Sequence, residues 1–576
     1  MSRRRQGAKL FPVLVALSLF APTAEATPDI SKTLPDAYLV LPFENASGVS
    51  GLDWMRAGLA AALAEKLEAD PTMRPAYGQL ILPDGASSPV IDAVAVAHAG
   101  VAAGASLVWT GRYARPAWTL EVTLRLWKVD GSQVMLVGEA TERGDFATTF
   151  DMLSRLSLEL LASANRAPSP LLAEKIRRSP TRDFYAFTLF GRGLTALHGL
   201  GKPVELAKAE KDLSRCVFID PKFAEAHRML SVVYEQLGQP AKARGQKTYA
   251  LDLRPDYYAP LAGLVRVAFT TKARLEGIEL ATRALAIRSW DLEVRYMLGE
   301  MLWEEGDVDG AYTEMKRLVD FRPDYVEARR ILVLIHATKG ANEDLARELE
   351  EIIRLDPGDE DSQLDLAAAY AALGREEAAI ATYGAVVAKN PKQLLALKLL
   401  GDLYKGRGEF ARAIEFYEKA LAANRNDPRP YFLLGAAYVD AGQAKKAVRI
   451  YQQAQRFPRY LGETYSNLGA LMVREDNAIG ALWYLSRAAA RLPARASVHY
   501  NYGLALSKTN QREPALRELS LASELDPDDA ETQYALGVVL LRIGRVEDAE
   551  KAFMECVRLS PKHEDALHNL HLIEEL

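Results

Sequence analysis

Three columns of residues recur at intervals of 34 along most of this chain, and no insertion interrupts the ten periods between Pro221 and Pro561. The first column holds small residues at most positions. It runs through Gly299, Val333, Ala367, Gly401, Gly435, Gly469, Gly503 and Gly537. Self-similarity with a period of roughly 20–50 residues is typical of stacked repeats, which grow by addition and need no closed core. The chain is therefore predicted to be mostly an array and not a set of globular domains.

The second and third columns predict that each repeat is a pair of helices. The second column holds Ala243, Gly277, Ala311, Leu345, Ala379, Ala413, Ala447, Ala481, Ala515 and Ala549. The third column holds Pro221, Pro255, Ser289, Pro323, Pro357, Pro391, Arg425, Arg459, Pro493, Pro527 and Pro561. Small residues let two helices approach closely, and proline ends a helix because it cannot donate a backbone hydrogen bond. Aromatic residues at helical spacing, such as Tyr404 and Tyr417, are predicted to fill the core.

These columns resemble the tetratricopeptide repeat (TPR) over about residues 184–576. The resemblance implies a mostly α protein with an α-α solenoid of about eleven repeats, closed by a capping helix at Glu564–Leu576. In the first repeat, Gly191-Arg192-Gly193 matches the small-residue column. Four extra residues follow it, so Gly199–Pro203 is predicted to form a loop.

The two cysteines obey the same period. Cys216 and Cys556 are 340 residues apart, which is ten periods, so they are predicted to occupy equivalent places near opposite ends of the solenoid. A disulfide needs Cα atoms about 6 Å apart. We therefore expect two separate buried thiols in an apolar column.

Residues 36–162 lack the 34-residue columns and instead contain short apolar and alternating segments, which predict a small α+β domain. Strands are expected at 38–43, 106–113, 120–126 and 134–142, and helices at 52–69, 90–103 and 146–162. Alternation of apolar and polar residues over 120–126 indicates a half-buried strand, and Asp130-Gly131 indicates a hairpin turn. We expect the helices to cover one face of the sheet. Residues 163–183 contain three prolines and are interpreted as a linker with a short helix.

Short motifs in this domain resemble a known family. Leu41-Pro42-Phe43-Glu44-Asn45, Asp53-Trp54 and Gly58-Leu59 are followed by Gly104-Ala105 and Gly111. They resemble the amino-terminal domain of the periplasmic TolB family (a FlgO-like domain). The resemblance implies a periplasmic domain that binds proteins and has no active site.

The first 26 residues are predicted to be a secretory signal peptide. Arg3–Arg5 and Lys9 precede a short apolar run at Leu10–Ala21, and Ala24-Glu25-Ala26 offers a cleavage site. The apolar run is shorter than the roughly 20 residues that a membrane-spanning helix needs. We therefore expect a periplasmic or otherwise exported chain with no integral span after cleavage. The alternative is that the segment is retained as an amino-terminal anchor.

The sequence contains no catalytic constellation. It has neither a Gly-x-Ser-x-Gly elbow nor a phosphate-binding Gly-x4-Gly-Lys-Ser/Thr loop. His563 and His568 are five residues apart and so point in different directions on a helix. The net charge of −5 gives no support for a nucleic-acid partner. We expect no enzyme activity, cofactor, metal or nucleic acid.

The best-formed repeats are predicted to hold a partner in their groove. The resemblance implies that the first helix of each repeat lines the concave surface, where asparagine amides pair with the backbone of a peptide. The predicted partner-binding residues are Tyr465, Asn467, Arg474, His499, Tyr500, Asn501, Lys508, Tyr534, Arg542 and Asn569.

Three functions are compatible with this organisation. The first is an exported scaffold that binds several envelope proteins or peptides through the groove and the α+β domain. The second is a dedicated assembly or regulatory subunit of an envelope, secretion or motility complex, with one obligate partner. The third is an enzyme whose site lies in the α+β domain, with Glu44, Asp53 and Arg112 as the candidate residues. The number and stoichiometry of captured partners would separate the first two.

Overall fold

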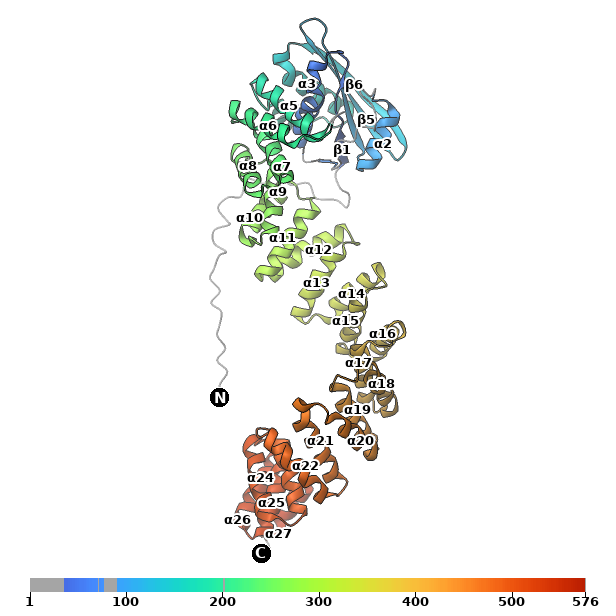
Figure 1. The fold of residues 1–576 in the computed structure, drawn as a ribbon, viewed down its shortest axis with the longest axis vertical. Helices are drawn as coiled ribbons and strands as arrows, with labels where there is room; N and C mark the ends of the chain where they lie inside the picture. The colour runs from blue at the N-terminus through green and yellow to red at the C-terminus, as the bar shows by residue number, and fades with distance from the viewer. Residues whose placement is uncertain (1–35, 71, 77–90, 200–202, 575–576) are drawn as a thin grey trace. The chain divides into compact units, whose positions relative to one another are not determined.

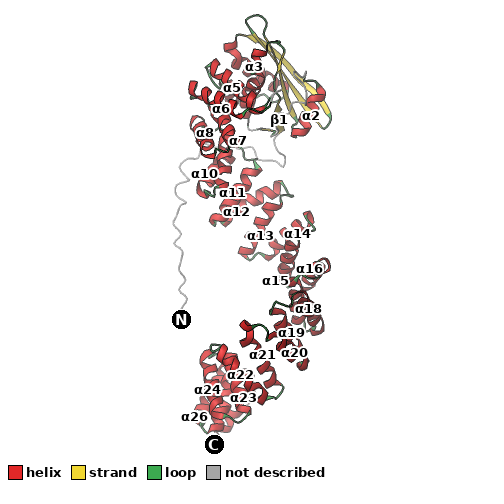
Figure 2. Ribbon diagram, viewed as in Figure 1, coloured by secondary structure: helices red, strands yellow, loops and turns green. Residues whose placement is uncertain are grey.

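The computed structural model describes residues 36–70, 72–76, 91–199 and 203–574. The chain divides into two compact units, Met1–Ile335 and His336–Leu576, which are described separately below. Figures 1 and 2 show the amino-terminal unit with a sheet and helices, and the carboxyl-terminal unit with helices. The predicted signal peptide lies outside the described residues.

Helix pairs follow one another from residue 184 onward, as the sequence columns predict. Over the described residues, α5–α26 form eleven pairs, and α27 (Glu564–Glu574) follows them. The first helices of the pairs are α5 (Phe184–His198), α7 (Ala224–Gln236), α9 (Tyr258–Thr270), α11 (Leu292–Glu305), α13 (Val326–Lys339), α15 (Glu360–Ala372), α17 (Leu394–Gly406), α19 (Arg429–Asp440), α21 (Leu461–Arg474), α23 (Ala496–Lys508) and α25 (Ala530–Ile543). The second helices are α6 (Leu206–Ile219), α8 (Pro240–Leu253), α10 (Arg274–Ile287), α12 (Val308–Phe321), α14 (Asn342–Leu355), α16 (Glu376–Lys389), α18 (Phe410–Ala423), α20 (Ala444–Ala454), α22 (Ala478–Arg491), α24 (Arg512–Leu525) and α26 (Val546–Leu559). The prediction of a mostly helical solenoid is confirmed.

The small-residue column brings the two helices of a pair together. A Cβ atom added to Gly503 would lie 2.5 Å from Cγ of Leu519, and one added to Gly537 would lie 2.6 Å from Cε1 of Phe553. In both cases the large side chain comes from the second helix of the same pair. The third pair reverses this arrangement, since Val265 and Ala281 occupy the corresponding places and both are buried. In these three pairs one position is small and the other is larger, and either helix can supply the larger side chain.

A fourth column lies at the turn between the two helices of each pair from the second to the eleventh. Its residues share a positive φ, which only glycine adopts at little cost. They are Gly238, Lys272, Gly306, Gly340, Gly374, Gly408, Gly442, Asp476, Asn510 and Gly544. The turns are short: three residues separate α15 from α16, whereas seven separate α5 from α6. The four extra residues in the first pair agree with the predicted insertion, of which residues 200–202 lie outside the described part.

The α+β domain contains a six-stranded sheet. The strands are β1 (Asp36–Val40), β2 (Glu44–Asn45), β3 (Met73–Pro75), β4 (Leu107–Ala114), β5 (Leu120–Asp130) and β6 (Gln133–Gly144). Their order is β3-β1-β4-β5-β6, with β2 beside β4. The first three strands are parallel to their neighbours, and β4, β5 and β6 are antiparallel. The predicted hairpin turn is present, with Gly131 at a φ of +57°.

Helices cover both faces of this sheet, so the expectation of a single covered face is wrong. The helices α1 (Met55–Glu68) and α3 (Thr149–Ser163) share a core with Tyr38 and Val40 on one face. On the other face, α2 (Ala93–Ala103) packs over Leu39 and Leu41. The sequence of β1 gives the reason. Successive side chains of a strand point to opposite faces of the sheet, so an unbroken apolar run is buried on both faces.

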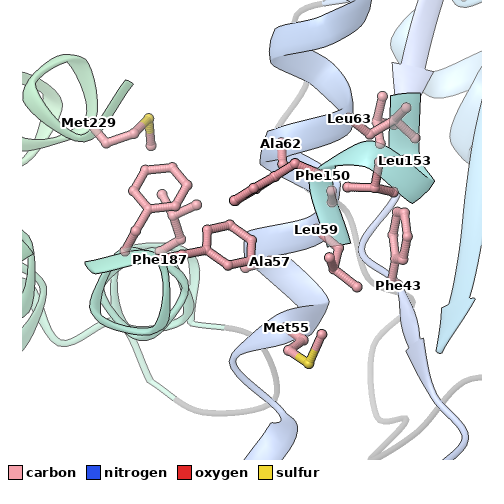
Figure 3. Packing of buried hydrophobic residues seen from close by; sticks show 14 of the residues in the cluster. Phe43, Met55, Ala57, Leu59, Ala62, Leu63, Phe150, Leu153, Phe187 and Met229 are labelled. Atoms are coloured by element: carbon pink, nitrogen blue, oxygen red, sulfur yellow. The ribbon is translucent and has the colours of Figure 1, made fainter. Parts of the chain in front are cut away.

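The α+β domain and the first repeat share one hydrophobic core. Phe187 of α5 lies with its ring centroid 5.5 Å from that of Trp54 and 4.7 Å from that of Phe150. Figure 3 shows Phe187 pointing toward α1 and toward Phe150. A Cβ atom at Gly191 would lie 2.5 Å from the ring of Trp54, so this glycine allows α5 to approach α1. Gly193 instead faces Leu213 of its own pair, 2.6 Å from such a Cβ, and is the true member of the small-residue column.

The predicted linker is packed against the domain that precedes it. It contains the expected short helix, α4 (Pro170–Arg177), and Ile176 is fully buried. The ammonium group of Lys66 donates hydrogen bonds to the carbonyl oxygens of Ile176 at 2.9 Å and Arg178 at 3.0 Å, and to Oγ of Ser154 at 2.8 Å. Residues 163–183 therefore form part of the first unit.

Both cysteines are free and fully buried, as predicted. The thiol of Cys216 lies 3.1 Å from the carbonyl oxygen of Ala186, and burial raises its pKa to about 12. Burial also raises the pKa of the Cys556 thiol. Across the described residues, no helix is long and apolar enough to span a bilayer.

Candidate partner-binding face of the carboxyl-terminal repeats

The first helices of the last repeats lie side by side in the second unit. Among them, α21 contacts α23 and α23 contacts α25, whereas contacts between the second helices α22, α24 and α26 of successive pairs are weaker. Helices that approach one another more closely lie on the inner side of a curved stack. The side formed by α21, α23, α25 and α27 is called the inner face below. It is the face on which the predicted partner-binding residues were placed.

The asparagine column lies half-buried on this face. Asn501 donates a hydrogen bond of 2.7 Å to the carbonyl oxygen of Ser497, and Asn569 donates one of 2.7 Å to that of Asp565. Each bond holds an amide to its own helix and leaves its oxygen able to accept from a partner's N–H. Asn467 is half-buried at the same position of α21.

Three tyrosines flank the asparagines. Tyr500 and Tyr534 are half-buried, and burial with nearby carboxylates raises the pKa of both, that of Tyr500 to about 12. They therefore stay protonated at neutral pH and can donate a hydrogen bond. Tyr465 instead packs edge-on against Trp483 of α22, with ring centroids 5.7 Å apart. It belongs to an aromatic cluster between the helices of its own pair.

His499 is a structural residue, and its prediction as a partner-binding residue is wrong. Its side chain is buried, with Nε2 3.1 Å from the carbonyl oxygen of Pro493 and Nδ1 2.6 Å from Oε2 of Glu518. Other pairs repeat this arrangement, in which a side chain binds the carbonyl oxygen of the closing residue six positions earlier. The equivalent side chains are His227, Arg295, Arg329, Gln363, Tyr431 and Gln533. The column therefore stabilises the turn between repeats.

The predicted basic residues lie at the carboxyl ends of the first helices. Arg474 is exposed and donates a hydrogen bond of 3.3 Å to the carbonyl oxygen of Val439. Lys508 forms an ion pair of 2.8 Å with Asp476 in the preceding turn. Arg542 is exposed, and its backbone carbonyl accepts a hydrogen bond of 2.8 Å from Arg512. These three residues line the edge of the inner face and join neighbouring repeats there.

Acidic residues at the opposite ends of the same helices escaped the sequence analysis. Glu463, Glu531 and Asp565 lie in the first turns of α21, α25 and α27. Glu531 is largely exposed and lies 3.6 Å from Nε2 of His563. The inner face therefore has an acidic edge, an amide-bearing middle and a basic edge. The available signal was that Glu463, Glu531 and Asp565 recur at multiples of 34 residues, in a column four positions before that of the asparagines.

In the α+β domain, the residues considered for catalysis lie on β2, on β4 and just before α1. Glu44 and Arg112 are neighbours in the register of β2 and β4. Asp53 accepts a hydrogen bond of 2.8 Å from Asn45. No cluster of His, Cys, Asp or Glu that could hold a metal occurs among the residues that the structure describes.

Three parts of the chain match models of known families. Residues 401–442 match a TPR repeat and residues 503–564 match a tetratricopeptide repeat. Residues 299–394 match a bacterial transcriptional activator domain and fall within α11–α17 of the array. The chain therefore contains TPR repeats, as the columns predicted, and proteins with such repeats bind protein or peptide partners.

Several solved structures are similar to stretches of the chain. YrrB, a TPR protein described as having an unusual peptide-binding site, is 25% identical over 32% of this chain and 96% of its own, with a TM-score of 0.28. MamA from Desulfovibrio magneticus RS-1 is 22% identical over 30% of this chain and 96% of its own, with a TM-score of 0.27. A tetratricopeptide repeat protein from Parabacteroides merdae ATCC 43184 is 14% identical over 43% and 98%, with a TM-score of 0.36. No curated protein matches the chain.

Proposed function

We propose that this chain is an exported scaffold that binds peptide segments of cell-envelope proteins on the inner face of its last repeats. The observation that supports this most strongly is the column of Asn467, Asn501 and Asn569 on the first helices α21 and α23 and on α27, which Ala535 of α25 interrupts. Its spacing suits a partner in an extended conformation, because successive amides can pair with backbone groups along one peptide. The acidic and basic edges would then fix the direction of the bound segment.

Export is supported by the amino-terminal residues. A basic segment, an apolar run of about twelve residues and Ala24-Glu25-Ala26 form the pattern of a cleavable signal. The likeness of residues 36–162 to the TolB amino-terminal domain favours a periplasmic location and a second docking surface. Mass spectrometry of the chain from a bacterial periplasmic fraction should find Thr27 at the amino terminus. A chain that stays in the cytoplasm would refute export and leave peptide binding open.

The groove is tested by replacing the three asparagines together with alanine. Crosslinking and pulldown from envelope extracts should recover partners with the unmodified chain and lose most of them with the triple variant. Thermal stability should change little, because the amides are half-buried and make few bonds within the protein. Unchanged capture by the triple variant would refute the groove.

A matched control uses three residues on the second helices. Arg517, Glu524 and Lys551 are exposed on α24 and α26. Replacing them with alanine removes as many side chains from the carboxyl-terminal repeats without touching the inner face. This variant should capture partners as well as the unmodified chain does. The stoichiometry of capture separates a scaffold, with several substoichiometric partners, from a dedicated subunit with a single stoichiometric one.

A further inference from the structure

A cleft of about 460 Å³ lies in the first unit, apart from the inner face described above. One wall comes from the carboxyl end of α1 and from the segment that follows α4. The other wall comes from the turns α6–α7 and α8–α9 and from the end of α10. Sites for small molecules typically measure about 300–1,000 Å³. The cleft therefore has the size of a small-ligand site.

Basic side chains outnumber acidic ones around this cleft. Among the described lining residues, five are basic, namely Lys66, Lys175, Arg178, Lys222 and Arg254, and three are acidic, namely Glu65, Glu68 and Asp256. With all of them ionised, the lining has a net charge of +2. A concave surface concentrates such a field and attracts anions.

The carboxylates of the cleft already have cationic partners. Glu65 is paired with Arg254, Glu68 lies 3.1 Å from Arg288, and Asp256 lies 3.4 Å from Lys175. No carboxylate partner of Arg178 or Lys222 is found in the described part of the chain. Both side chains are exposed at the cleft, and they come from different walls. Two positive charges are therefore left to face the same cleft.

Lys66 adds a buried positive charge. Only 4% of the residue is exposed, and its three hydrogen bonds go to a hydroxyl and two carbonyl oxygens, all uncharged. Burial lowers the pKa of its ammonium group to about 8, because the neighbouring carboxylates only partly offset the lost hydration. An anion in the adjacent cleft would supply the missing counter-charge.

Tyr257 places an unpaired donor in the wall. The residue is 1% exposed, and its hydroxyl has no hydrogen-bond partner within the described residues. The guanidinium of Arg254 lies 4.3 Å from the centre of its ring. A buried hydroxyl without a partner destabilises the folded protein. A hydrogen bond to an oxygen of a bound ligand would remove that penalty.

We propose that this cleft binds a small anionic ligand carrying a phosphate or carboxylate group. Arg178 and Lys222 contact the anion from opposite walls, Lys66 contributes charge from behind, and the Tyr257 hydroxyl donates a hydrogen bond. A ligand held in this way would join the linker segment to the first repeats. The site is independent of the asparagine column.

Binding is tested by calorimetric titration of the full chain with pyrophosphate and, separately, with citrate. At least one probe should bind saturably, and Arg178→Ala/Lys222→Ala should weaken that binding by at least about tenfold. Tyr257→Phe should also weaken it, without lowering the melting temperature, because the lost hydroxyl has no partner in the folded protein. Binding of pyrophosphate alone assigns a phosphate ligand, and binding of citrate alone assigns a carboxylate ligand.

The matched control is Arg182→Ala/Lys211→Ala. These side chains are exposed, carry the same charges and lie outside the cleft. The control should bind the probe as the unmodified chain does. The proposal is overturned if neither probe binds below about 10 mM, or if the cleft variants and the control bind equally well.

Discussion

The packing of Gly537 against Phe553 predicts a strong coupling between these two positions. Phe553 is fully buried, and a Cβ atom at Gly537 would lie 2.6 Å from its ring. Replacing Phe553 with alanine should cost about 3–5 kcal/mol. Replacing Gly537 with valine overfills the same space and should cost about 1–3 kcal/mol or more. Independent effects would therefore add to roughly 4–8 kcal/mol.

The double variant G537V/F553A should cost about 2–3 kcal/mol less than that sum. It recreates the arrangement of Val265 and Ala281, in which the first helix supplies the larger side chain. The added valine fills part of the cavity that the lost ring leaves, so each change offsets part of the other. Hydrogen exchange of α25 and α26 gives the local free energy of opening, which suits a repeat array better than a single global transition.

A glycine without close neighbours is the control for this measurement. Gly384 lies in α16, and a Cβ atom there would meet nothing within 4 Å. Gly384→Val should leave local stability unchanged or raise it slightly, since valine has a higher helix propensity than glycine. A coupling below about 0.5 kcal/mol between positions 537 and 553 would show that the glycine is not required by the ring.

Three further measurements follow from the structure. Lys272 has a φ of +58° in a column otherwise rich in glycine. Lys272→Gly should therefore raise the free energy of opening of α9 and α10, measured by hydrogen exchange, by about 1 kcal/mol. An unchanged free energy of opening would show that Lys272 is not strained. Burial raises the pKa of Glu65 to about 7, above its unfolded value of about 4.3, so the folded state binds this proton more tightly. Between about pH 7 and pH 4.5, the free energy of urea unfolding of the first unit should therefore rise by roughly 1–3 kcal/mol more in the unmodified chain than in Glu65→Gln. Parallel pH profiles of the two proteins would show that Glu65 does not bind this proton more tightly in the folded state. The buried Cys216 thiol, with a pKa of about 12, should resist iodoacetamide at neutral pH until the protein is unfolded, and rapid labelling of the native chain would contradict its burial.

The helix pairs could be predicted from the sequence because each column has a local cause. A glycine facing a large side chain, and a proline that ends a helix, act within one repeat and recur with it. The turn column was missed although Gly306, Gly340 and Gly374 are spaced by 34 residues. Lys272, Asp476 and Asn510 interrupt it, and their positive φ becomes visible only in the structure.

The exposure of single residues was harder to predict than the fold. His499 lies next to Tyr500 and Asn501 in sequence, yet its ring turns inward to Pro493 and Glu518. Adjacent residues on a helix face different directions, so a position near the groove does not establish access to it. A useful signal would have been the column of polar side chains six residues after each closing residue, which includes His227 and Gln363.

The first repeat shows what the inner face can hold. Gly191 precedes the small residue Gly193 by two positions, as Asn501 precedes Gly503, so Gly191 and Asn501 are equivalent. Trp54 packs onto Gly191, which places the start of the chain's own helix α1 against the side of α5 that corresponds in sequence to the inner face. That contact depends on the absence of a side chain, because a Cβ atom at Gly191 would already overlap the ring. Asparagine at the equivalent position excludes such an approach and offers an amide instead. The first repeat is therefore built for a packed helix, whereas the peptide binding that we propose for the last repeats would depend on hydrogen bonds to the asparagine amides.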